Sequence, residues 1–228
     1  AALDDVDLRL TRGETLGVVG ESGSGKSTLA RCLMRLTPLD AGEVEVAGRP
    51  FSRLEGAALL AERHRVQMVF QDPYGSLNPR QRVETIIGTG LWLRGVPRAE
   101  ARERIAAMLA EVGIDPAAMA RYPHEFSGGQ RQRIAIARAL VMEPEVLIAD
   151  EAVSALDVSV QAQVLRLLAR MRARLDLSML FITHDLRVAA QICDRVLVMK
   201  DGRIVEEGPP GRVFAAPRDS YTRRLIDA

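Results

Sequence analysis

Short, continuous apolar runs alternate with longer amphipathic segments along this chain. The runs lie at residues 15–19 (TLGVV), 146–149 (VLIA) and 179–182 (MLFI). Runs of this length are typical of strands that are buried on both faces, as in parallel sheets. Segments with apolar residues at helical spacing lie between these runs, at 27–36, 130–141 and 159–175. The pattern predicts an α/β fold in which helices cover a mainly parallel sheet.

Weaker patterns predict the elements around this core. We expect further strands at Val6–Leu10, Glu43–Val46 and Arg65–Phe70 and an inserted helical lobe at Val83–Trp92 and Arg98–Val112. The stretch from Asp72 to Pro79 is rich in Pro, Gly, Ser and Asn and marks the boundary of that lobe. Asp201-Gly202 lies between two apolar runs and predicts a β-hairpin.

Composition removes several classes of protein from consideration. The 228 residues carry 31 basic and 30 acidic side chains, so the net charge of +1 argues against a protein that coats nucleic acid. Every apolar run is far shorter than the roughly 20 residues that span a bilayer, so we expect any membrane role to depend on a partner. Cys32 and Cys193 lack metal-ligand spacing and favour a reducing compartment. The chain opens at Ala1 inside an alternating pattern, and we expect it to be a piece of a longer protein.

The first candidate site is a glycine-rich loop between a predicted strand and a predicted helix. Its sequence matches the phosphate-binding pattern GxxxxGK[ST] at every position, in the order Gly20, Glu21, Ser22, Gly23, Ser24, Gly25, Lys26, Ser27 and Thr28. Glycines let consecutive N–H groups point inward at a helix start, which creates an anion site. Lysine is rare in this chain: Lys26 and Lys200 are its only two among 31 basic residues. We therefore expect Lys26 to reach the β- and γ-phosphates and Ser27 to hold Mg²⁺.

Two adjacent carboxylates end the apolar run 146–149. Asp150 leaves the predicted strand at its carboxyl end, where open α/β sheets place their ligands, and it suits a metal-bound water. Glu151 follows directly and points elsewhere, so it is the candidate general base for a water that attacks the γ-phosphate.

A second glycine-rich helix start lies about 100 residues beyond the first. The stretch Phe126-Ser127-Gly128-Gly129-Gln130 places a good N-cap, Ser127, before a periodic helix that stops near Pro144. A second anion-binding surface is useful when one γ-phosphate is enclosed from two sides.

With these elements in this order, the chain resembles the ATP-binding cassette (ABC) ATPases over essentially its whole length. The resemblance identifies residues 20–28 as Walker A, 126–130 as the signature, 146–151 as Walker B and 154–157 (SALD) as the D-loop, which ends at Asp157. It also makes Gln71 the Q-loop glutamine and His184 the switch histidine. The resemblance implies that Glu151, His184, Lys26 and Gln71 act in catalysis, and that Ser27, Gln71 and Asp150 bind Mg²⁺. It further implies that ATP contacts residues 20–28, Ser127, Gly128, Gly129, Gln130 and Asp157.

Two stretches narrow the resemblance to the ATPases of oligopeptide, dipeptide and nickel importers. They are residues 70–79 (FQDPYGSLNP) and residues 150–165 (DEAVSALDVSVQAQVL). In this family an aromatic stacks on adenine upstream of the segment that corresponds to Ala1–Leu10, and no aromatic occurs here before Phe51.

The resemblance implies a P-loop NTPase fold with a RecA-like core sheet, an antiparallel β subdomain and an inserted helical subdomain. We expect one ABC ATPase domain over residues 1–228, with the core in 1–71 and 144–228 and the helical signature subdomain in 72–143.

The same resemblance implies an importer subunit at the cytoplasmic face of the cell membrane. Two such domains would pair head to tail, as a homo- or heterodimer, and sandwich ATP between Walker A of one and the signature of the other. Their partners would be a transmembrane permease and an extracytoplasmic substrate-binding protein, with peptide or nickel as the cargo and with no nucleic acid. Two alternatives stay open: a non-transport ABC ATPase that acts on ribosomes or DNA, and a generic P-loop kinase, which has no use for residues 127–130.

Overall fold

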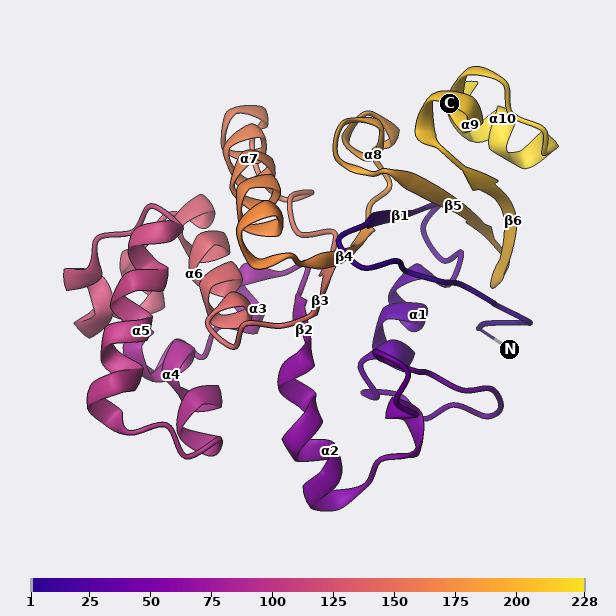
Figure 1. The fold of residues 1–228 in the computed structure, drawn as a ribbon. Coiled ribbons are helices and arrows are strands. Elements are labelled where there is room, and N and C mark those ends of the chain that lie inside the picture. Colours follow the sequence, from indigo (N-terminus) through magenta and orange to yellow (C-terminus); the bar gives the residue numbers. More distant parts are fainter. Residues whose placement is uncertain (1, 228) are drawn as a thin grey trace.

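The computed structural model describes residues 2–227, with the side chains of residues 73 and 74 left aside. One six-stranded sheet in the order β2-β3-β4-β1-β5-β6 forms its centre (Figure 1). The strands are β1 (Thr15–Val19), β2 (Val66–Val69), β3 (Val146–Asp150), β4 (Ser178–Ile182), β5 (Arg195–Lys200) and β6 (Arg203–Gly208). The first five in the sheet order are parallel, and β6 pairs antiparallel with β5.

Ten helices surround the sheet within the described part of the chain. They are α1 (Lys26–Leu33), α2 (Gly56–Glu62), α3 (Pro73–Ser76), α4 (Val83–Leu93), α5 (Arg98–Glu111), α6 (Gly128–Leu140), α7 (Val158–Leu175), α8 (Leu186–Ile192), α9 (Pro210–Ala215) and α10 (Ser220–Asp227). Short 3₁₀ turns cover Phe51–Arg53, Arg63–Arg65, Pro116–Ala120 and Pro123–Glu125. No described helix is both long enough and apolar enough to cross a membrane.

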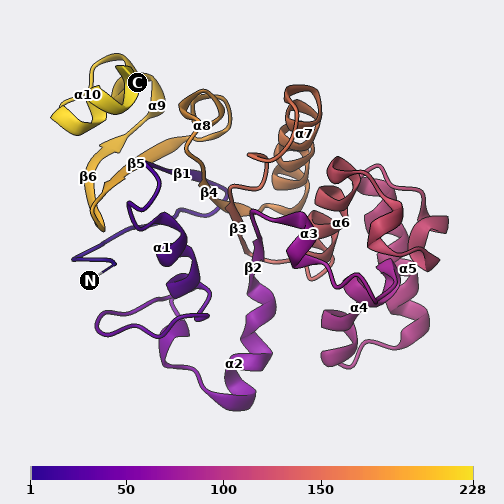
Figure 2. The same ribbon diagram turned by 180° about the vertical axis from the view of Figure 1, so that it is seen from behind.

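The helices lie in two layers, one on each face of the sheet, and in two groups at the ends of the sheet (Figures 1 and 2). Helix α1 covers one face of the sheet and α7 and α8 cover the other, while α4, α5 and α6 gather at the β2 end and α9 and α10 at the β6 end. Because side chains alternate along a strand, each strand contributes to both layers. Leu16 and Val18 of β1 pack in the α1 layer, whereas Val19 packs in the opposite one.

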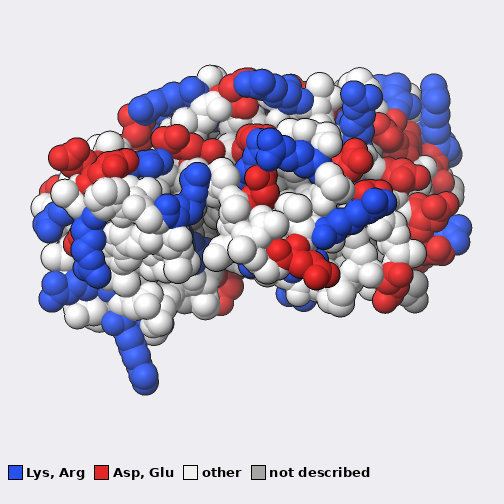
Figure 3. All heavy atoms as spheres, turned by 60° about the horizontal axis from the view of Figure 1, so that its bottom comes forward, with Lys and Arg blue, Asp and Glu red and all other residues white. Residues whose placement is uncertain are grey.

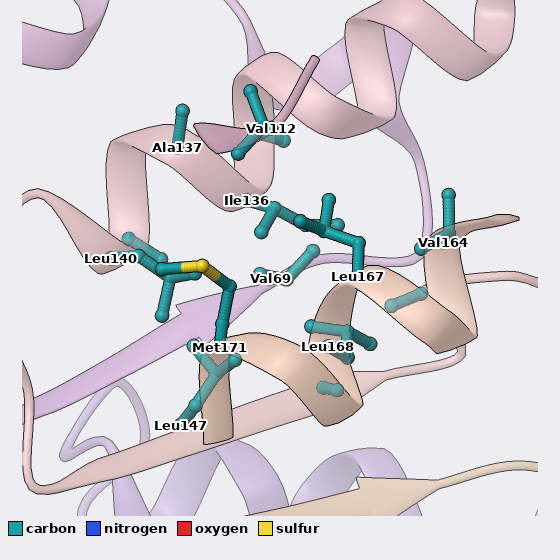
Figure 4. Packing of buried hydrophobic residues seen from close by; sticks show 14 of the residues in the cluster. Val69, Val112, Ile136, Ala137, Leu140, Leu147, Val164, Leu167, Leu168 and Met171 are labelled. Atoms are coloured by element: carbon teal, nitrogen blue, oxygen red, sulfur yellow. The ribbon is translucent and has the colours of Figure 1, made fainter. Parts of the chain in front are cut away.

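Packing between α6 and α7 joins the helical end to the sheet. Figure 4 shows Ile136 and Leu140 of α6 facing Leu168 and Met171 of α7, with Leu147 of β3 beside them. All five side chains are buried, and burying a side chain of this size contributes roughly 1.5–3 kcal/mol. The start of α6 is therefore presented from a helix whose body is firmly packed.

The predicted strands at Val6–Leu10 and Glu43–Val46 are wrong. Among the described residues this region holds only an isolated antiparallel bridge between Val46 and Arg49, so the expected antiparallel β subdomain lacks its strands here. The apolar positions that produced the alternation do pack against the α1 layer as partly buried side chains. Their burial satisfies the sequence pattern, but it does not provide the backbone partners that define a ladder.

Candidate nucleotide-binding site

The glycine-rich loop runs from β1 into α1 and is held from outside by two other segments. Gly25 has a φ of 106°, and a Cβ on it would lie 2.8 Å from the carbonyl oxygen of Ala2, so this position requires glycine. The backbone N–H of Gly202, in the β5–β6 turn, donates to the carbonyl oxygen of Ser24 at 3.0 Å. The loop that was predicted from a local motif therefore depends on contacts that are distant in sequence.

Lys26 occupies the centre of this loop. Its ammonium donates to the carbonyl oxygens of Gly20 at 2.8 Å and Glu21 at 2.7 Å, and it lies 3.3 Å from the hydroxyl of Ser24. The residue is only 5% exposed. Burial lowers the pKa of the Lys26 ammonium, and the carboxylates of Glu151 and Asp150 oppose this effect. The loop thus encloses one compact cation with exchangeable oxygen partners, which suits the binding of an anion.

Ser27 and Asp150 meet across the loop and the end of β3. The Ser27 hydroxyl donates to Asp150 Oδ1 at 3.2 Å, and Asp150 is buried. Burial raises the pKa of the Asp150 carboxyl, while the hydrogen bond from Ser27 lowers it. The described residues contain no group of three or more His, Cys, Asp or Glu that would bind a metal by themselves. Two hard oxygen donors fit Mg²⁺, which usually takes one or two protein ligands and completes its shell with phosphates and water.

Glu151, at the end of β3, contacts side chains that follow the two neighbouring strands β2 and β4. Its Oε2 accepts a hydrogen bond from the Gln71 side-chain amide at 2.8 Å and lies 3.3 Å from His184 Nδ1. Gln71 follows β2 and His184 follows β4, so adjacent parallel strands deliver both groups to the same edge. Glu151 itself has a φ of 48°, and its N–H donates to the Ile182 carbonyl oxygen at 3.0 Å. The chain therefore turns at Glu151, directly after the end of β3.

These groups surround one open cavity of about 820 Å³. Gln71, Glu151 and His184 line it together with residues 22, 23 and 25–28 of the loop. The structure therefore brings together the predicted phosphate loop, the candidate general base and the two polar side chains that were assigned from the resemblance. Ala2, Asp201 and Gly202 also line the cavity, although the sequence did not indicate them. The hairpin was predicted, but its place beside the loop depends on strand order.

The signature segment does not reach this cavity. Ser127 caps α6 by accepting the N–H of Gln130 at 3.3 Å, and Gln130 Oε1 accepts the N–H of Ser127 at 2.9 Å. Ser127 and Gln130 are exposed, and residues 127–130 are absent from the described lining of the cavity. Within one chain, the second glycine-rich helix start therefore does not contribute to the cavity beside the first.

Asp157 lies beside the signature segment. It caps α7 by accepting the Val160 N–H at 2.9 Å, and a Cβ on Gly129 would lie 2.5 Å from Val160 Cγ1. The helix starts of α6 and α7 therefore form one continuous exposed surface, in which Gly129 leaves room for Val160.

Comparison with known proteins identifies this arrangement. Residues 3–154 match the family model described as ABC transporter. The chain is 49% identical to the peptidoglycan transport ATP-binding protein YejF of Agrobacterium fabrum, over 100% of this chain and 42% of that protein. It is 48% identical to a putative peptide import ATP-binding protein of Brucella ovis, over 99% of this chain and 72% of that protein. It is also 49% identical to the glutathione import ATP-binding protein GsiA of Pectobacterium atrosepticum, over 100% of this chain and 37% of that protein. The chain thus spans less than half the length of two of these relatives.

Solved structures of ABC ATPases agree with the sequence relatives. The structure of cbiO1 from Clostridium perfringens, part of the ABC transporter complex cbiONQ, superposes with a TM-score of 0.84 and 32% identity, over 94% of this chain and 84% of that one. A dimeric ATP-binding cassette in a post-hydrolysis state, bound to ADP and Pi, superposes with a TM-score of 0.81 and 29% identity, over 92% of this chain and 90% of that one. The chain belongs to the ABC transporter family as an ATP-binding ATPase domain, which confirms the resemblance, the α/β P-loop NTPase fold and the class of enzyme predicted from its sequence.

Proposed function

We propose that this chain hydrolyses ATP as one half of a head-to-tail pair and thereby drives peptide import through a membrane permease. One observation carries the proposal: the chain has two glycine-rich helix starts suited to phosphate, but only the first lines the cavity that contains Glu151. A single chain thus supplies one half of each of two composite sites: the phosphate loop of one site and the signature segment of the other. The relatives with import names support the direction of transport and the class of cargo.

Phosphate binding follows from the loop geometry. Backbone N–H groups at the start of α1 donate hydrogen bonds to the phosphates of ATP, and Lys26 turns from the carbonyl oxygens of Gly20 and Glu21 toward the β- and γ-phosphates. Ser27, Asp150 and Gln71 would hold Mg²⁺. The metal would supply neutralisation of phosphate charge.

Glu151 is placed to activate the attacking water. Its carboxylate takes a proton from the water as the water oxygen bonds to the γ-phosphorus, and the bond from that phosphorus to the bridging oxygen breaks, which releases ADP and phosphate. His184 and Gln71 touch Glu151 Oε2 and fix the orientation of the carboxylate. Gln71 also lies between β2 of the sheet and the first helix of the helical lobe. Closure of the site would therefore move both parts of the chain.

A second copy, or a related domain, completes each site. Ser127, Gly128, Gly129 and Gln130 of one chain would close over the γ-phosphate held by the other, and Asp157 would lie at the same junction. The dimeric structural neighbour bound to ADP and Pi supports such pairing.

Residues 72–143 are proposed as the helical signature subdomain, and residues 1–71 and 144–228 as the nucleotide-binding core, of one ATPase domain. Movement between the two parts would be transmitted by Gln71 and the following loop to permease subunits, which would keep the chain at the cytoplasmic face of the membrane. An extracytoplasmic binding protein would select the cargo.

The alternative of a ribosome- or DNA-directed ABC ATPase is not favoured. The relatives are named as import or transport proteins, and acidic and basic side chains are interspersed on the face seen in Figure 3. The names of the relatives also favour peptides over nickel as the cargo.

Uptake by whole cells tests the proposal. In the source organism, deletion of the gene should abolish accumulation of a labelled peptide, and the wild-type gene should restore it while Lys26→Ala does not. Labelled nickel serves as the second substrate in the same cells. Unchanged uptake of both substrates after deletion would contradict an importer role, whereas loss of nickel uptake alone would reassign the cargo.

A further inference from the structure

We propose that Tyr221, near the end of the chain, is a positioning residue for the phosphate loop and sets its affinity for ATP. The inference rests on the proposed function, because it concerns the same nucleotide site. It depends on one hydrogen bond between residues 200 positions apart, and on the side chains that place the tyrosine there.

The contact fixes the backbone of Glu21 from outside the loop. The N–H of Glu21 donates to the Tyr221 hydroxyl at 3.0 Å, while the carbonyl oxygen of the same residue accepts the Lys26 ammonium at 2.7 Å. Both backbone polar groups of Glu21 are therefore engaged, one by the C-terminal helix and one by the lysine that we assign to phosphate binding. Tyr221 is only 5% exposed, and the Lys200 ammonium lies 5.4 Å from the centre of its ring.

A buried carboxylate organises the segment that carries the tyrosine. Glu206, on β6, accepts hydrogen bonds from the backbone N–H of Arg218 at 3.0 Å and of Asp219 at 3.1 Å. Burial raises the pKa of the Glu206 carboxyl, but these backbone hydrogen bonds, together with the Thr222 side chain and the charge of Arg212, outweigh it and the net pKa is lowered. The carboxylate form is therefore the one that the fold stabilises.

The same segment then starts helix α10. Asp219 Oδ1 accepts the N–H groups of Tyr221 at 2.7 Å and Thr222 at 3.4 Å, which is the pattern of an N-cap. This sequence of contacts runs from β6 through Glu206 and Asp219 to the phenol, and it fixes the phenol against the loop. The tyrosine is thus placed by the strand at the sheet edge rather than by the loop itself.

The consequence concerns the moment at which ATP binds. When the phosphates draw Lys26 away, the carbonyl oxygen of Glu21 keeps the Ser24 N–H as a partner at 3.2 Å, and Tyr221 still holds the N–H of Glu21 from outside the loop. A loop that is already oriented loses less conformational freedom on binding, and preorganisation of this kind raises affinity. Because one neutral hydrogen bond is at stake, we expect an effect of about fivefold.

The substitution Tyr221→Phe removes the hydroxyl and keeps the ring. The full chain should bind a fluorescent ATP analogue with a Kd about fivefold higher, and its KM for ATP should rise while kcat stays within about twofold. In hydrogen–deuterium exchange, the Glu21 amide should exchange faster than in the wild type. Arg224→Ala, at an exposed position on the same helix, is the matched control and should change neither quantity.

A second variant separates positioning from general stability. Glu206→Gln weakens the support for α10, so it should also raise the Kd for the analogue, and its effect should largely vanish when Tyr221→Phe is already present. An unchanged Kd in Tyr221→Phe, or equal effects of Glu206→Gln in both backgrounds, would overturn the inference. Failure of the wild-type chain to bind the analogue would instead overturn the proposed function.

Discussion

The phosphate loop and the signature segment are both glycine-containing helix starts, but they are held in opposite ways. Three distant groups support the phosphate loop: the N–H of Gly202, the hydroxyl of Tyr221 and the carboxylate of Asp150. The signature segment is capped within its own first turn, where Ser127 and Gln130 exchange two hydrogen bonds. The first region is therefore held by distant parts of the fold, whereas the second is held by its own local hydrogen bonds.

The difference extends to what lies beneath each region. Helix α6 packs against α4 and α5 at the helical end of the molecule, and it also contacts α7 on the sheet (Figure 4). The phosphate loop belongs to the sheet. The proposed closing motion between lobe and sheet would therefore change the direction in which the signature segment faces and leave the phosphate loop intact.

The largest expected effect is on the rate of hydrolysis, when the candidate general base beside the phosphate loop is replaced. Glu151→Gln should lower kcat by about 10²–10⁴-fold, because the amide does not accept the proton of the attacking water. ATP binding should persist, since the loop is unaltered. Phosphate release and the binding of a fluorescent ATP analogue measure the two quantities, with Glu103→Gln, at an exposed position of α5, as the control. Equal turnover by mutant and wild type would remove Glu151 from the role of base.

A mixture of two inactive variants tests whether the two regions serve the same site. Ser127→Arg blocks the signature surface and Lys26→Ala blocks the loop, so each variant alone should be nearly inactive. In a mixed pair one site carries both defects and the other carries neither. An equimolar mixture should regain about a quarter of the wild-type rate, because half of the pairs are mixed and each has one working site. Normal hydrolysis by Ser127→Arg alone would show that the signature has no part in turnover.

A smaller effect, on the affinity for ATP, is expected from a substitution that changes the shape of the side chain in the loop and keeps its charge. Lys26→Arg keeps the cation, but a planar guanidinium does not fit where three oxygens enclose an ammonium within 3.3 Å. The affinity for ATP should fall by about tenfold, which is close to 1.4 kcal/mol. Titration calorimetry measures it, and the melting temperature shows whether the fold is intact. An unchanged affinity would mean that charge alone matters at this position.

Elements with complete local signals could be predicted from the sequence. β1, the loop and α1 occur where the motif places them, and the hairpin turn at Asp201-Gly202 has both residues at positive φ, as its sequence requires. The predicted helix at 27–36 ends earlier, at Leu33. The Leu36 N–H closes back on the Arg31 carbonyl oxygen at 2.8 Å, with Arg35 at a φ of 53°. This kind of helix end usually has glycine at the left-handed position, so the sequence with arginine there did not predict it.

Features that depend on partners distant in sequence could not be predicted. Alternation at Val6–Leu10 indicates which side chains are buried, but a strand also requires a neighbouring backbone, and none pairs with this segment among the described residues. The contact of Tyr221 with Glu21 was missed for a related reason. A tyrosine in a helix that follows the sheet has no local sign that it faces the phosphate loop.

The β5–β6 turn also bears on how this chain tolerates insertions and deletions. Hairpin tips usually accept extra residues, because they project into solvent. Here the Gly202 N–H donates to the Ser24 carbonyl oxygen, and its carbonyl oxygen accepts the Asp4 N–H. The turn therefore acts as a spacer of fixed length between the sheet edge and the nucleotide. Lengthening it by one residue would displace the phosphate loop, so natural length variation should be found elsewhere on the surface.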